Sequence, residues 1–117
     1  MVLIMSSIAE KLRAARRIEI KIGEITFTGT RVTPEQYSIY MHNSFSDAEV
    51  CRRHIEMVEG AKESDLFEGA PKTPWKFNKD DFSEALAEKP DWYKPIVKKL
   101  IEDASEKYQQ KAENEKN

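Results

Sequence analysis

Cys51 and His54 are the two side chains in this sequence whose types and spacing could most readily do chemistry. Three positions apart on one helix face, a thiolate and an imidazole could share a metal ion or act as nucleophile and base. A structural zinc site normally has two such pairs, and the sequence offers one. Both residues also fall in an apolar stripe with Val50, Ile55 and Val58. We therefore predict that they pack in the core and bind no metal or cofactor.

A second set of ionisable side chains is acidic: Asp80, Asp81 and Glu84. Adjacent helix positions do not face each other, so these residues do not read as a catalytic pair. Acids in a first helical turn are explained by the helix dipole alone. The sequence also lacks a glycine-rich phosphate loop and a nucleophile elbow. We predict that the protein is not an enzyme.

Aromatic and apolar residues in the second half of the chain are the candidates for binding a partner. Trp and Tyr concentrate at binding hot spots, although packing in the core is their ordinary fate, and both interpretations remain open. An apolar Leu-Phe pair also stands between charged residues in a predicted loop, where it is either shielded or offered to a partner. The candidate partner-binding residues are Leu66, Phe67, Trp75, Phe77, Trp92 and Tyr93.

The elements near the N-terminus are predicted to be one helix and one hairpin. A serine cap followed three residues later by glutamate predicts a helix over residues 7–16. Alternating isoleucines over residues 18–22 predict a strand. Gly23 and Glu24 then suit a two-residue type II′ turn into a return strand, which ends or bulges at Gly29.

The rest of the chain reads as helices around one long loop. We predict a helix beginning at Thr33, a helix from Ser46 to Gly60, a loop over residues 61–77, and helices beginning at Asn78 and Asp91. The last helix ends at Tyr108, and the polar residues 109–117 are predicted to be a disordered tail. The predicted fold class is mainly α (α+β): four to five helices with one N-terminal β-hairpin, in a single domain over residues 1–108.

Composition excludes several functional classes. The 117 residues include 19 basic and 21 acidic ones, for a net charge of −2, which argues against a general nucleic-acid binder or a polybasic membrane module. One local basic cluster is predicted to be a solvated helix face, with nucleic-acid contact as the alternative: Lys11, Arg13, Arg16 and Arg17. A single cysteine and a short apolar start over residues 1–5 predict a cytoplasmic protein without signal peptide or membrane span.

Three stretches carry a pattern beyond general composition. Residues 23–35 combine a short strand, a basic residue and a helix started by Thr-Pro. Residues 58–66 read Val-Glu-Gly-Ala-Lys-Glu-Ser-Asp-Leu, similar to a Trp-Glu-Gly-Val-x-Glu-x-Asp-Leu segment, with Val58 in place of tryptophan. Residues 74–82 and 89–96 follow a Pro-x-x-Phe…Pro-x-x-x-x-x-Ile ending before the last helix.

Over roughly residues 20–108, these stretches resemble the tail assembly chaperones of long-tailed bacteriophages. The resemblance implies a non-enzymatic protein that coats the long, helical, apolar tape measure protein and helps to bring tail tube subunits to it. The implied partners are the tape measure and tail tube proteins, in the bacterial host cytoplasm. Association with further copies of the chain remains open. A second function remains open: a small cytosolic adaptor or regulatory domain that could bind nucleic acid through the basic N-terminal helix.

Overall fold

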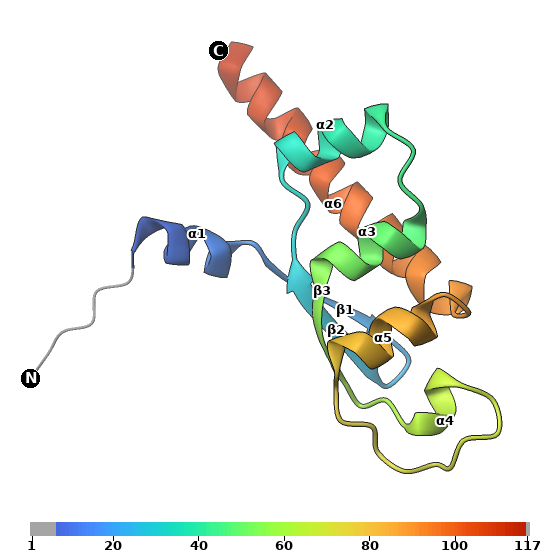
Figure 1. The fold of residues 1–117 in the computed structure, drawn as a ribbon. Helices are drawn as coiled ribbons and strands as arrows, with labels where there is room; N and C mark the ends of the chain where they lie inside the picture. The colour runs from blue at the N-terminus through green and yellow to red at the C-terminus, as the bar shows by residue number, and fades with distance from the viewer. Residues whose placement is uncertain (1–6, 117) are drawn as a thin grey trace, which may run out of the picture.

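The structure, a computed structural model, describes residues 7–116 and builds helices onto a three-stranded antiparallel sheet of order β1-β2-β3 (Figure 1). The elements are α1 (Ile8–Ala15), β1 (Arg17–Ile22), β2 (Ile25–Thr30), α2 (Pro34–His42), α3 (Asp47–His54), β3 (Ile55–Glu59), α4 (Glu63–Leu66), α5 (Lys79–Leu86) and α6 (Pro90–Lys116). The predicted class, mainly α with a hairpin near the N-terminus, is confirmed.

The hairpin forms as its sequence predicts. Ile22 lies directly opposite Ile25, so the turn between β1 and β2 has two residues. Gly23 has a φ of +60°, the conformation that a type II′ turn requires at its first central position. On the inner face of the sheet, Phe27 is fully buried and meets Trp92 of α6 edge to face, with ring centroids 5.2 Å apart. This contact fixes the sheet against the longest helix.

The segment after α3 corrects the prediction of a helix over residues 46–60. Its last five residues form β3, which pairs with β2 and gives the sheet a third strand. Phe27 lies opposite Val58 but Gly29 lies opposite Ile55, so β3 holds one extra residue, a β-bulge. The bulge turns both Ile55 and Val58 into the core. Two buried residues three positions apart are also what a helix would show, so the sequence alone favoured a helix here.

Two residues make the switch from α3 to β3 possible. A Cβ atom on Gly29 would come within 1.9 Å of the carbonyl oxygen of His54, so only glycine permits this approach of the two strands. The amino group of Lys79 donates to the carbonyl oxygens of Arg52 and Ile55. A positive charge there suits the negative end of α3. It also ties the start of α5 to the junction of α3 and β3.

The last helix, α6, is 27 residues long and differs from its prediction at both ends. It begins at Pro90, one residue before its predicted start at Asp91, because the fixed φ of proline suits the first helical position. It continues to Lys116 through residues predicted to be disordered, since Ala, Glu, Gln and Lys there are good helix formers. Residues 1–6, which hold the apolar start, and Asn117 lie outside the described residues.

The N-terminal helix α1 stands away from this body, as Figure 1 shows. Ser7 caps it as predicted, accepting a hydrogen bond from the backbone amide of Glu10. Every residue from Ile8 to Ala15 is exposed. A single residue, Arg16, separates α1 from β1, and its carbonyl oxygen accepts a hydrogen bond from the backbone amide of Arg31. The helix is thus held at a fixed point of the sheet without being packed on it.

Candidate partner-binding groove

Cys51 and His54 lie in the core, as predicted. Cys51 is fully buried, and burial raises the pKa of its thiol to about 12, which leaves it inert at neutral pH. His54 donates its Nδ1 proton to the carbonyl oxygen of Thr30 (3.0 Å), so its Nε2 accepts from the hydroxyl of Tyr40 (2.8 Å). Burial also lowers the pKa of His54 and keeps the ring neutral. Within residues 7–116, no three His, Cys, Asp or Glu side chains gather to hold a metal ion.

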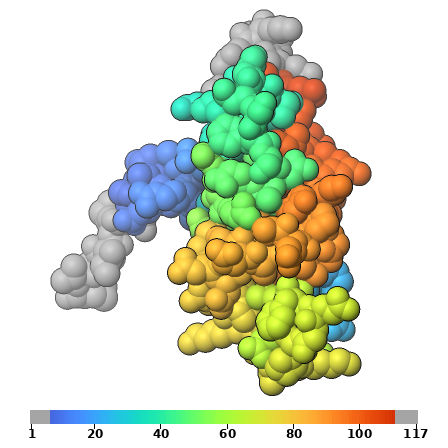
Figure 2. Space-filling model, turned by 45° about the vertical axis from the view of Figure 1, so that its right-hand side comes forward, coloured from blue at the N-terminus to red at the C-terminus, as the bar shows by residue number. Residues whose placement is uncertain are grey.

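Three of the six candidate binding residues meet at one open groove. Leu66, Phe67 and Trp75 line a hollow of about 440 Å³ between α4, the loop that follows it, and α5. Figure 2 shows α4 and α5 as neighbours on this face of the molecule. Leu66 and Trp75 are largely covered, whereas the side chain of Phe67 is 61% exposed. An aromatic ring left in water beside an apolar floor is typical of a protein-binding surface.

Backbone hydrogen bonds hold the long loop in place beside the groove. The amide of Trp75 donates to the carbonyl oxygen of Ala61 (2.9 Å), and the amide of Glu63 donates to that of Thr73 (2.9 Å). The two ends of the loop are thereby closed on each other, as in an Ω-loop. The indole Nε1–H of Trp75 also donates to a carboxylate oxygen of Asp81 on α5 (3.3 Å). The groove walls are therefore linked before any partner arrives.

The rim of the groove is acidic. Its charged lining consists of Glu63, Asp80, Asp81, Glu84 and Glu88, and no described lysine or arginine lines it. Asn78 caps α5, which begins where it was predicted, by accepting hydrogen bonds from the backbone amides of Asp80 and Asp81. The first-turn acids thus serve the helix dipole and the groove together. An apolar floor with an anionic rim suits a segment that combines apolar and basic side chains.

The other three candidate residues do not reach the groove. Trp92 is buried against Phe27, and Phe77 is half-buried with its ring 6.0 Å from that of Phe82. Tyr93 is half-buried on α6. These three residues pack on the core, which was the other interpretation of their types left open by the sequence.

The acidic residues of the rim are not among the binding candidates predicted from the sequence. A signal was present, because Asp81, Glu84 and Ala85 are three and four positions apart and so share one face of α5, and Glu88 follows two residues after the end of this helix. The opposite wall of the groove, formed by α4 and the loop after it, shows no periodic pattern of apolar or charged residues in the sequence. Only the fold brings that loop to the acidic face.

The chemistry of the groove is the main guide to what the protein binds. Comparisons of the chain with protein-family models, curated proteins and solved structures find no match. Within the described residues, none of the helices combines the length and the apolar character needed to cross a bilayer.

Proposed function

We propose that this protein is a non-enzymatic binder of an apolar helix, and that it serves as a phage tail assembly chaperone whose client is the tape measure protein. The exposed Phe67, set in a groove with Leu66 and Trp75, carries the proposal. Two of the three sequence stretches that resemble this family, residues 58–66 and 74–82, contribute Leu66 and Trp75 to the groove, and Phe67 directly follows the first of them. The likeness and the groove thus support one another.

A helix is the partner form that the groove suits. Helix-in-groove recognition places apolar side chains at i, i+3, i+4 and i+7 into an apolar channel. Phe67 and Trp75 supply large aromatic contacts on one wall, and Ala85 leaves room on the opposite wall at α5. The acidic rim favours helices flanked by Lys or Arg, because charge complementarity speeds the encounter and rejects acidic partners.

A chaperone of this kind acts before the client is assembled. By covering apolar faces of the tape measure protein in the host cytoplasm, it keeps that protein soluble until tail tube subunits surround it. Reversible binding is required, and an open groove with one exposed aromatic anchor is compatible with it. No bond of the client is made or broken.

Replacing Phe67 by serine tests this function. We expect Phe67→Ser to cost about 2 kcal/mol of binding free energy, roughly thirtyfold in Kd, because a central aromatic anchor is lost. The fold should persist, since this side chain is mostly exposed. The measurement is co-expression with the tape measure protein of the same phage, followed by co-purification and calorimetry with a client helix.

Met57→Ser is the matched control. Met57 is also a large exposed apolar side chain, 41% exposed, but it lies on β3 outside the groove. The control should retain and solubilise the client as the unchanged protein does. Equal loss in both variants, or no co-purification with the unchanged protein, would contradict the proposed function.

A further inference from the structure

The N-terminal helix presents an apolar face that no other described part of the chain, residues 7–116, covers. Ile8 and Leu12 lie one turn apart on α1, and their side chains are 70% and 49% exposed. An isolated helix of eight residues is marginal in water, so α1 gains stability only against another surface. The basic side chains of α1 and the residues after it, Lys11, Arg13, Arg16 and Arg17, are exposed as well.

The groove between α4 and α5 complements this helix in its apolar character and in its charge. Its floor is apolar, and the ring of Phe67 beside the floor is exposed, as is the side chain of Leu12. Its rim carries five carboxylates, whereas α1 carries the single acid Glu10. Apolar residues would meet apolar residues and cations would meet anions across such a contact.

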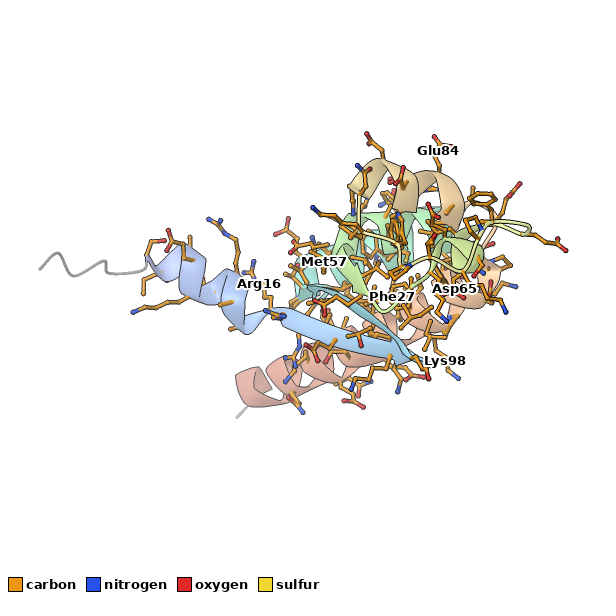
Figure 3. All side chains as sticks on the ribbon, turned by 90° about the horizontal axis from the view of Figure 1, so that it is seen from below. Arg16, Phe27, Met57, Asp65, Glu84 and Lys98 are labelled. Carbon is orange, nitrogen blue, oxygen red and sulfur yellow. The ribbon has the colours of Figure 1, made fainter. Side chains whose placement is uncertain are left out.

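The helix cannot fill the groove of its own chain. Arg16 alone separates α1 from β1, and the hydrogen bond from Arg31 to its carbonyl oxygen anchors that link. Figure 3 places Arg16, at the base of α1, and Glu84, on α5, on different sides of the molecule, with α1 pointing outward. An α1 helix that fills the groove must therefore belong to another copy.

We propose that α1 of one copy docks in the acidic groove of a second copy. The contact is heterologous, because each copy offers one helix and one groove, and it extends copies into chains or closes them into rings. Self-docking covers the exposed Phe67 when no client is present. A client helix then competes with α1 for the same groove, a consequence that rests on the proposed function, whereas the docking itself does not.

Two single variants, measured alone and mixed, test the docking by molar mass in solution. Leu12→Ser damages the helix and keeps the groove, and Phe67→Ser damages the groove and keeps the helix. Both side chains are exposed, so both variants should fold. We expect the unchanged protein to form dimers or larger species and each variant alone to be monomeric. Their mixture should form a dimer of twice the monomer mass, because one intact helix meets one intact groove.

A charge exchange tests the electrostatic part of the contact. Arg13→Glu and Glu84→Lys should each weaken self-association, and the double variant, in which every contact carries the two charges exchanged, should recover it. A monomeric unchanged protein, variants that keep its mass, or a Leu12→Ser and Phe67→Ser mixture that stays monomeric would overturn the proposal. Binding of α1 to anionic lipid vesicles, lost in Leu12→Ser while the unchanged protein stays monomeric, would instead assign the helix to a membrane surface and also overturn it.

Client binding separates this inference from the proposed function. Leu12→Ser should bind a tape measure helix at least as tightly as the unchanged protein, since the competing helix is lost, and Phe67→Ser should not bind it. Dimers in the mixture without client binding by any form would leave the self-docking standing and remove the chaperone function. Client binding without dimers in the mixture would support the chaperone function and overturn the self-docking.

Discussion

At the scale of single residues, one buried histidine organises the meeting of several elements. His54 joins the carbonyl oxygen at the end of β2, on Thr30, to the hydroxyl of Tyr40 in α2. Burial of His54 could be predicted from the apolar stripe in which it lies. Its partners could not, because they are 24 and 14 residues away in the chain and no local pattern links them. The residue type that first suggested a metal or a catalytic base serves the fold.

Removing the hydroxyl of Tyr40 should weaken the fold. In Tyr40→Phe, the Nε2 atom of His54 loses its donor while remaining buried, which costs about 1–3 kcal/mol. The free energy of unfolding in urea measures this cost. Tyr108→Phe, at a tyrosine that is 46% exposed, is the control and should change the stability little. Equal stability of Tyr40→Phe and the control would argue against this hydrogen bond.

Stability should also fall in mild acid because of His54. Its pKa is lowered by burial in the folded protein, while in the unfolded chain it stays near the ordinary value of about 6.5. As the pH drops below that value, the unfolded chain binds a proton that the folded protein does not, so unfolding is favoured. Above it both forms are neutral and the effect vanishes.

Urea unfolding at pH 7.5 and pH 5.5 measures this effect, with His54→Gln as the comparison. The charged neighbours Arg53, Glu56 and Lys79 are present in both proteins, so the comparison isolates the ring. We expect the unchanged protein to lose more stability between these two pH values than the variant does. An identical loss in both would assign the acid sensitivity to other groups.

At the scale of elements, structure that depends on neighbouring residues could be predicted from the sequence, and a strand that depends on a distant contact could not. The hairpin could be predicted because its turn depends on Gly23 and its neighbours alone. The third strand could not, because the bulge opposite Gly29 gives Ile55 and Val58 the spacing of a helix. The choice between helix and strand there is made by pairing with β2, a contact far along the chain.

Gly29→Ala should be among the most damaging substitutions in the sheet. The added Cβ would collide with the carbonyl oxygen of His54, and β3 would have to move away from β2. We expect a loss of about 3 kcal/mol in the free energy of unfolding, a magnitude typical of a severely overpacked site. Thr28→Ala, at the preceding half-exposed position, should cost much less. Comparable effects at Gly29 and Thr28 would mean that the strands are not packed this closely.

At the scale of the whole molecule, the proposed client binding and self-docking depend on two surfaces that lie apart. One is the groove with an apolar floor and an acidic rim, and the other is the exposed, basic α1. Leu66, Phe67 and Trp75 could be predicted as binding candidates from their types and their place in a long loop. Their contact with the acids of α5 could not be predicted, because the fold of the loop back onto that helix has no sequence pattern.

The most direct test of the groove is an NMR titration that follows the two tryptophan indole N–H signals. Trp75 lines the groove and Trp92 is buried in the core, so one protein contains both the reporter and its internal control. Leu12→Ser is the form to use, since it should keep the groove open. On addition of a tape measure helix, we expect the Trp75 signal to move and the Trp92 signal to stay. A bound client that shifts Trp92, or neither signal, would contradict binding at this groove.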